Sequence, residues 1–318
     1  MYYIGVDLGG TNIAVGLVDK DGHILAKKSV RTFAQRSFAQ IMQDMASCIL
    51  ALLKEQQVEL AQVDSIGIGS PGSLDTENGE LVCAYNFKDG IHVPLRDLLR
   101  QHIDKPVYIG NDANVAALGE VVAGAAKGYK DAVMITLGTG VGGGIIIDGK
   151  IYEGYRSAGA EMGHILLMHH GRPCTCGRLG CWEAYASATA LIEQTIEAMT
   201  AHPESILNQT PEAQVNGRTA FDAMRKGDAV AKEVVDTYIE YIAQGIVDIV
   251  NVFRPEIVII GGGICNEGDT LLAPLRAFVH KYSFGGELNA PQKIEVAKLG
   301  NDAGIIGAAM LGIRRKSV

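Results

Sequence analysis

The sequence lacks a long basic run, a secretory leader and a long apolar run, and each absence excludes a class of protein. The 318 residues carry a formal net charge of −8, whereas a nucleic-acid partner normally requires a basic face. The opening MYYIGVDLGG has no basic segment followed by a leucine-rich one, as a signal peptide would. No apolar run approaches the roughly 18 residues that a membrane span needs. We therefore expect a cytoplasmic protein without nucleic-acid or membrane partners.

The composition is typical of a soluble globular enzyme with more than one domain. Hydrophobic residues make up 47% and charged residues 20% of the chain. A chain of this length exceeds one ordinary domain, so two lobes are expected. No low-complexity linker separates them, which predicts lobes joined by ordered elements.

Two similar segments about 130 residues apart predict an internally duplicated α/β fold. The first, residues 2–30, has three short β-forming stretches separated by GGTN and KDG turns. The second, residues 132–152, repeats the order of strand, Gly-Thr turn, strand, Asp-Gly turn and strand. Helical spacing of apolar residues predicts helices over 37–57 and 229–253. The apolar face of the second helix is suited to either a core or an interface, and we expect a core.

Three glycine-rich turns are candidates for phosphate binding, because glycine lets backbone N–H groups approach an anion closely. Two of the turns carry a threonine hydroxyl, and the first follows Asp7, which is suited to Mg²⁺. A dinucleotide fingerprint is disfavoured, because a strand rather than a helix follows GTGVGGG. The turns therefore favour ATP, with candidate residues Asp7, Gly9, Gly10, Thr11, Asn12, Gly138, Thr139, Gly140, Gly261, Gly262 and Gly263.

Three closely spaced cysteines predict a structural zinc site. Cys174, Cys176 and Cys181 have the spacing C-x-C-x4-C, and three thiolates with one imidazole form a common closed tetrahedral zinc site. In a reducing compartment such a cluster favours metal over disulfides. Spacing alone leaves the fourth ligand open among His164, His169 and His170.

Carboxylates near these motifs are candidates for catalysis and sugar binding. Asp112 follows the strand PVYI, at a position that commonly faces a ligand crevice. An Asx-turn or a helix N-cap is an equally good interpretation, because ANVAALGEVV is helical in pattern. Glu161 and Glu183 flank the cysteine loop, where a metal would fix them as acceptors for hydroxyl groups.

Together these motifs resemble the ROK family of sugar kinases, transcriptional repressors and related proteins, and within it the bacterial glucokinases. The resemblance covers nearly the whole chain. It depends on DLGGTN at 7–12, GNDAN at 110–114, LGTGVGGG at 137–144, EMGH at 161–164, CTCGRLGCWE at 174–183 and VIIGGGI at 258–264. The E-x-G-H element followed by C-x-C-G-x-x-G-C-x-E is the most specific part.

The resemblance implies an actin-like, ribonuclease-H-like α/β fold with two lobes and duplicated βββαβαβα-type halves. We expect a small N-terminal lobe over 1–120 and a larger C-terminal lobe over 121–300 that contains the zinc loop, residues 164–181. The C-terminal helix, about 301–318, is expected to pack back onto the first lobe. Family members are commonly dimers or tetramers, so a homodimer or homotetramer is expected.

The resemblance also implies the ligands of zinc and sugar. It selects His164 as the fourth zinc ligand, so that zinc orients this histidine and the loop presents Glu161 and Glu183 to the sugar. The same likeness adds four residues to the sugar site: Gly72, Asn86, Asn111 and Asp112. The chain departs from the family at YNFKDGIHVP, where Gly90 leaves one flank of the sugar pocket undetermined.

The implied activity is ATP-dependent phosphorylation of a hexose, with D-glucose converted to glucose 6-phosphate. Asp112 would accept the proton of the 6-hydroxyl group, while Mg²⁺ near Asp7 and the first two turns neutralise the phosphates. Gly261–Gly263 and the Asn301-Asp302 turn would lie along the adenosine. N-acetylmannosamine, N-acetylglucosamine, fructose, allose and a polyphosphate donor stay open. A sugar-responsive repressor is disfavoured, because the first hairpin begins at Ile4 and the chain is acidic.

Overall fold

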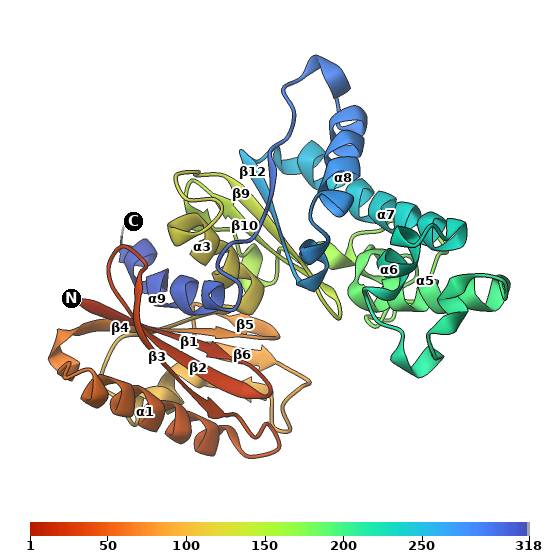
Figure 1. Ribbon diagram of the computed structural model, residues 1–318. Helices are drawn as coiled ribbons and strands as arrows, with labels where there is room; N and C mark the ends of the chain where they lie inside the picture. The colour runs from red at the N-terminus through yellow and green to blue at the C-terminus, as the bar shows by residue number, and fades with distance from the viewer. Residues whose placement is uncertain (317–318) are drawn as a thin grey trace. The chain divides into compact units, whose positions relative to one another are not determined.

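Two five-stranded sheets form the framework of the computed structural model (Figure 1). The structure describes residues 1–316, and side chains as far as Ile313. The last two residues of the helix expected over 301–318 therefore lie outside the described part. The chain forms two compact units: unit 1 contains 1–134, 144–160 and 297–318, and unit 2 contains 135–143 and 161–296. The lobe boundaries expected at residues 120 and 300 stay predictions.

The first sheet has the strand order β3-β2-β1-β4-β8. β1 (Tyr2–Leu8) pairs antiparallel with β2 (Asn12–Val18), which pairs antiparallel with β3 (Ile24–Arg31). On its other side β1 pairs in parallel with β4 (Val63–Ser70), which pairs in parallel with β8 (Val107–Asn111). Since β1, β4 and β8 run in the same direction, their carboxyl ends meet at one edge of the sheet.

Helices cover both faces of this sheet (Figure 1). α1 (Phe38–Glu55) begins at Ser37, which forms a capping box with Gln40, and packs on a core that includes Ile4 and Val6. Side chains alternate between the faces of a strand, so Gly5 lies on the opposite face. There a Cβ on Gly5 would stand 1.9 Å from the carbonyl oxygen of Ile305. The C-terminal helix α9 (Asp302–Lys316) thus approaches the backbone of the sheet closely.

Shorter elements complete unit 1. A three-stranded sheet of β5 (Ser73–Asp75), β6 (Glu80–Cys83) and β7 (Ile91–Val93) is too short to show a clear alternation in the sequence. α3 (Asp112–Ala123) follows β8 and packs against α9. The others are η1 (Leu60–Gln62), α2 (Leu95–Arg100) and η2 (Tyr155–Ser157).

The second sheet repeats the order of the first, β11-β10-β9-β12-β13. Its strands are β9 (Ala132–Leu137), β10 (Val141–Ile147), β11 (Lys150–Ile151), β12 (Ile257–Gly261) and β13 (Ile294–Val296). β10 and β11 are antiparallel and β12 and β13 are parallel, as in the corresponding strands of the first sheet. The duplication expected from the sequence is confirmed.

The helices of unit 2 include α7 (Ala229–Phe253), which is capped by Asp228 and ends at Arg254 in a left-handed conformation. Its apolar face is buried within the chain, so the expected core role is confirmed. The remaining helices are α4 (Glu183–Ala186), α5 (Ala188–Ala201), α6 (Thr219–Arg225) and α8 (Asp269–Tyr282). Single turns are η3 (Met162–His164), η4 (Ile206–Gln209), η5 (Glu212–Gln214), η6 (Gly263–Glu267) and η7 (Gly286–Leu288). Within the described residues, the helices are too short or too polar to cross a bilayer.

Candidate active site and metal centre

The carboxyl ends of β1, β4 and β8 gather several of the predicted site residues. Gly9 follows β1, Gly72 lies just past β4, and Asn111 ends β8. The side-chain amide of Asn111 donates a hydrogen bond to the carbonyl oxygen of Gly72 at 3.3 Å. The structure therefore brings Gly72 and Asn111 together, next to Asp112.

Asn111 rather than Asp112 caps helix α3. The Asn111 side-chain oxygen accepts hydrogen bonds from the backbone N–H groups of Ala113 at 3.0 Å and Asn114 at 3.3 Å. Asp112 is the first residue of the helix, and its Oδ1 also accepts from Ala113 at 2.8 Å. The Asp112 side chain is exposed. The N-cap interpretation of Asp112 is therefore wrong, because its neighbour performs that function.

Asp7 lies near Asp112 and carries a strongly perturbed carboxyl group. Burial, and secondly the negative charge of Asp112, raise the pKa of Asp7 to about 6. Its side chain is on the α9 face of the sheet, where a Cβ on Gly304 would stand 3.4 Å from its carboxyl carbon. A bound divalent cation would relieve the cost of ionising the Asp7 carboxyl group.

A pocket of about 560 Å³ surrounds the first phosphate turn. Its lining includes Asp7 and Gly9–Asn12, together with the Asn301-Asp302 turn that was assigned to adenosine. It also includes Lys27 and Lys28 of β3, which sequence reasoning missed. Lys27 forms an ion pair with Asp302 at 2.7 Å. Lys28 forms an ion pair with Glu55 at 2.5 Å, so both lysines line the pocket as members of ion pairs. The adjacent Lys27 and Lys28 were the sign of this basic group in the sequence.

Asn86 lies on an exposed loop beside this turn. Its amide nitrogen would be 3.2 Å from a Cβ on Gly10. The loop is closed by a hydrogen bond from the backbone N–H of Ala84 to the carbonyl oxygen of Gly90 at 2.7 Å. A Cβ on Gly90 would stand 2.3 Å from the carbonyl oxygen of Ala84. Gly90, the departure from the family pattern, thus permits the loop that carries Asn86.

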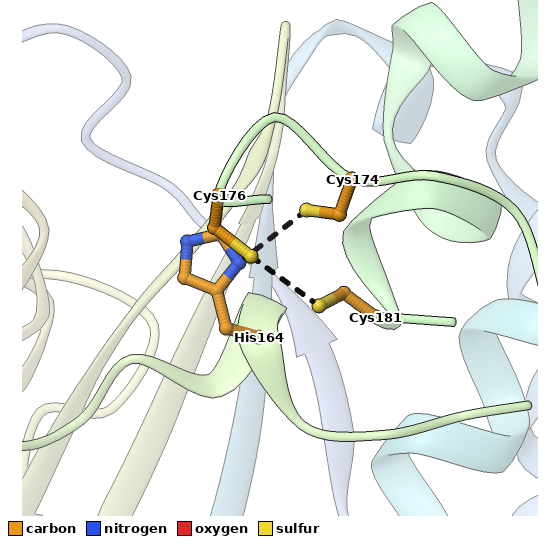
Figure 2. A group of neighbouring side chains, drawn as sticks. All are labelled: His164, Cys174, Cys176 and Cys181. Carbon is orange, nitrogen blue, oxygen red and sulfur yellow. Dashed lines mark hydrogen bonds between the residues drawn. The ribbon is translucent and has the colours of Figure 1, made fainter. Parts of the chain in front are cut away.

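In unit 2, His164, Cys174, Cys176 and Cys181 form one cluster (Figure 2). Their ligand atoms all lie within 4.8 Å of one another. Nδ1 of His164 is 3.7 Å from the sulfur of Cys174, and the sulfurs of Cys176 and Cys181 are 3.6 Å apart. Figure 2 shows the three sulfurs and one ring nitrogen facing a common centre.

The cluster fits a tetrahedral zinc ion. Zn–S bonds of about 2.3 Å and Zn–N bonds of about 2.0 Å place tetrahedral ligand atoms roughly 3.5–3.8 Å apart, which matches the two distances above. Burial, and then hydrogen bonds with Cys176 and Cys174, raise the pKa of Cys181 to about 12. A thiolate there is costly without a cation, so the donor set is one that metal binding would stabilise.

The fold separates the three candidate histidines. Among the residues that the structure describes, the group that includes the cysteines contains His164. His169 and His170 are exposed and contact each other, with ring centroids 3.8 Å apart. His164 is placed by the single turn η3, whose Gly163 crosses β10 closely. A Cβ on Gly163 would stand 2.2 Å from the carbonyl oxygen of Val141, which explains the glycine in E-x-G-H.

Glu161 and Glu183 flank the cluster differently. Glu161 is exposed, and its carbonyl oxygen accepts a hydrogen bond from the His164 N–H at 3.1 Å. Glu183 begins α4 and accepts from the Val141 N–H at 3.0 Å and from the Thr175 hydroxyl at 3.2 Å. The contact with Val141 was not foreseen from the sequence.

The other two glycine-rich turns also lie in unit 2. Gly138 donates its N–H to the carbonyl oxygen of Gly140 at 3.0 Å, which closes the turn between β9 and β10. Gly261 ends β12, and Gly263 begins η6. A Cβ on Gly263 would meet no heavy atom within 4 Å, so this backbone is open to a ligand.

The sequence profile of the ROK family matches residues 3–315. The chain belongs to the ROK family. It is 39% identical to the glucokinase of Thermotoga maritima over 97% of this chain and 96% of that protein. It is 30% identical to the xylose repressor of Caldicellulosiruptor bescii, over 98% of this chain and 77% of the repressor.

A solved ROK structure is similar over almost the whole chain. The ROK family glucokinase from Streptomyces griseus, in complex with glucose and AMPPNP, is 36% identical and has a TM-score of 0.79. The match covers 98% of this chain and 99% of that chain. With the repeated sheet order, this confirms the actin-like, ribonuclease-H-like α/β fold expected from the sequence.

Proposed function

We propose that this ROK protein is an ATP-dependent kinase that phosphorylates glucose on its 6-hydroxyl group. The observation that carries the proposal is the exposed Asp112 carboxylate at the start of α3, near the half-buried Asp7. Asn111 supplies the helix cap, so the cap does not depend on Asp112. Similarity to glucokinases over nearly the full length of both chains supports the same activity.

Asp112 acts as the general base. A sugar hydroxyl is a weak nucleophile, so proton removal must accompany its attack on the γ-phosphate. The carboxylate of Asp112 takes the proton of the 6-hydroxyl, the new O–P bond forms, and the bond between the γ-phosphorus and the bridging oxygen of ADP breaks. The products are glucose 6-phosphate, ADP and a proton that Asp112 later releases.

The phosphates are held by backbone N–H groups and charge. We assign Gly9–Asn12 and Gly138–Gly140 to the phosphates, with Gly261–Gly263 and Asn301-Asp302 along the adenosine. Asp7 is the residue that would hold Mg²⁺, which supplies positive charge near the transferred phosphoryl group. Lys27 and Lys28, which line the pocket of the first turn, add further positive charge.

We assign the hexose to Gly72, Asn86, Asn111 and Asp112, together with Glu161, His164 and Glu183. His164, Cys174, Cys176 and Cys181 would hold a structural zinc, which supplies a fixed centre for the loop. With Nδ1 of His164 facing the sulfurs, its other ring nitrogen is left for a sugar hydroxyl.

The substrate is tested by a coupled assay of ADP release over a panel of hexoses. We expect glucose to give the highest kcat/KM, above N-acetylmannosamine, N-acetylglucosamine, fructose and allose. Replacing ATP by polyphosphate in the same panel, with glucose 6-phosphate measured directly, identifies the donor. Glucose turnover below that of another hexose would reassign the substrate within the same kinase class.

The role of Asp112 is tested by Asp112→Asn, which keeps the shape and removes the basic oxygen. We expect kcat to fall by about 10²–10⁴, while glucose binding measured by calorimetry persists. Asp104→Asn is the matched control, because Asp104 is exposed in the same unit and the charge change is identical. Near wild-type turnover in Asp112→Asn would show that Asp112 is not the base.

The repressor alternative has weaker support, since the identity to the xylose repressor is 30% against 39% for the glucokinase. A gel shift with promoter DNA tests it, and we expect no binding. The homodimer or homotetramer and the cytoplasmic location stay predictions.

A further inference from the structure

Glu183 joins the zinc loop to the second phosphate turn, Gly138–Gly140. Its Oε1 accepts the Thr175 hydroxyl at 3.2 Å and lies 3.6 Å from the sulfur of Cys174. Its Oε2 accepts the backbone N–H of Val141, directly after the turn, at 3.0 Å. Each oxygen of one carboxylate is therefore bonded to a different segment, and all of these residues belong to unit 2.

The carboxylate occupies the space that a side chain at residue 140 would need. A Cβ on Gly140 would stand 2.3 Å from Oε2 and 3.1 Å from the carboxyl carbon of Glu183. Gly138 in the same turn is different, because its Cβ would meet no heavy atom within 4 Å. Gly140 is thus a glycine because Glu183 lies against the turn.

The residues after Glu183 fasten the same turn. At the start of α5, Ala188 donates its N–H to the carbonyl oxygen of Gly138 at 2.8 Å. The Thr189 hydroxyl donates to the carbonyl oxygen of Thr139, also at 2.8 Å. The segment that begins at the zinc ligand Cys181 is therefore attached to the turn along its length. A displacement of the Glu183 carboxylate must be felt at Gly140 and Val141, because packed segments of this kind do not deform independently.

We propose that Glu183 is a positioning residue that couples hexose binding to nucleotide binding. An ionised carboxylate only accepts hydrogen bonds and has about four lone-pair sites, so Oε1 can receive a hexose hydroxyl beside or in place of Thr175. Oε2 meanwhile keeps the phosphate turn in its binding conformation. Bound hexose therefore tightens ATP binding, and by thermodynamic reciprocity ATP tightens hexose binding by the same factor. The inference rests on the proposed glucokinase function.

Two alanine substitutions in unit 2, at Gly140 and at Gly217, separate this role from general damage. Gly140→Ala pushes the carboxylate away, so we expect weaker glucose binding without nucleotide. The factor by which AMPPNP tightens glucose, about fivefold or more in the wild type, should fall to about one. Gly217→Ala adds the same methyl group in unit 2 where no heavy atom lies within 4 Å, and should leave glucose affinity and its tightening by AMPPNP within about twofold of the wild type. Zinc content should be unchanged in both variants.

Glucose is titrated with and without AMPPNP, and binding is followed by the fluorescence of Trp182, the chain's single tryptophan. Trp182 is buried, precedes Glu183, and donates its indole N–H to the carbonyl oxygen of Tyr241 at 2.7 Å. Glu183→Gln keeps the number of heavy atoms, and it is the second variant for this test if Gly140→Ala does not fold. The one carbonyl oxygen of glutamine can still accept the hydrogen bond from the Val141 N–H. Its NH₂ group cannot accept a hydrogen bond from a sugar hydroxyl, so the coupling between glucose and AMPPNP should again be lost.

The inference is overturned if Gly140→Ala and Glu183→Gln keep the wild-type coupling, or if Gly217→Ala loses it equally. A wild-type enzyme that phosphorylates glucose without any coupling overturns the inference alone. A wild-type protein that neither binds glucose nor releases ADP overturns the proposed function, and the inference with it.

Discussion

Asp7, which we assign to Mg²⁺, should lower the stability of the fold when it ionises. Its pKa is raised from 3.8 to about 6 by burial and by Asp112, so the folded state disfavours the ionised form. A raised carboxyl pKa means that stability is lost as the pH rises between these two values. Binding of a divalent cation reverses that cost, which is the usual trade between activity and stability.

Asp7→Asn should therefore be more stable than the wild type at pH 7.5 but inactive. We expect the free energy of unfolding to rise by about 1–3 kcal/mol without Mg²⁺, measured by urea denaturation. The gain should shrink by more than half when the pH is lowered to about 4.5, where the native Asp7 is already protonated. A less stable variant at pH 7.5 would contradict this account, and Asp104→Asn again controls for lost charge.

Individual residues were predictable where chemistry depends on local spacing. The spacing of Cys174, Cys176 and Cys181 was sufficient to predict a metal cluster, and the structure places the sulfurs together. Spacing could not choose among the histidines, because only the fold brings His164 back to the cysteines. The dependence of Gly140 on Glu183 was also hidden, since the two residues meet only after β10 and α4 have formed.

At the scale of elements, we expect the order of the proposed zinc loop to depend on its metal. Residues 164–181 contain isolated bridges rather than regular strands, between Leu166 and Cys181 and between Pro173 and Leu179. Its backbone hydrogen bonds are those of turns and isolated bridges, and several of its side chains are exposed. We expect such a loop to be held weakly without metal. We therefore expect the conformation of the loop, and the positions of the Glu161, His164 and Glu183 side chains, to depend on the cluster.

Removing one zinc ligand should abolish metal and sugar binding together. Elemental analysis should give about one zinc per chain in the wild type and almost none in Cys176→Ala, because structural zinc sites need all four ligands. The glucose dissociation constant should rise at least about tenfold. Cys48→Ala, which removes a thiol from the core of unit 1, should keep its zinc. Metal-free protein with unchanged glucose affinity would break the proposed link between the loop and the sugar.

Regular elements were predictable in proportion to their length. The helices expected over 37–57 and 229–253 correspond to α1 and α7, each ended by a cap. The three-residue strands β5 and β7 were missed, because so short a segment shows no period. β3 was predicted as a strand, but its two lysines in the phosphate pocket were overlooked.

At the scale of the whole molecule, the repeated hairpin opening was enough to predict two sheets of one topology. The sequence could not show where the chain passes between the two units. Two of the four passages fall inside the strands β9 and β10, where no linker marks them. The last passage, before residue 297, is followed at once by contacts with Glu120 of α3. Oε1 of Glu120 accepts the N–H groups of Lys298 at 2.9 Å and Leu299 at 2.8 Å.

Glu120 is fully buried, and its Oε2 accepts the N–H of Ala125 at 2.6 Å. It thereby joins the end of α3 to the segment that leads into α9, and so closes unit 1 with its own C-terminal helix. Glu120→Gln replaces one acceptor by a donor that faces a backbone N–H, and should lower the free energy of unfolding by about 1–3 kcal/mol. Glu77→Gln, at an exposed position in the same unit, makes the same charge change and should have almost no effect. Urea unfolding curves of equal midpoint for the two variants would show that Glu120 does not hold the C-terminal segment in place.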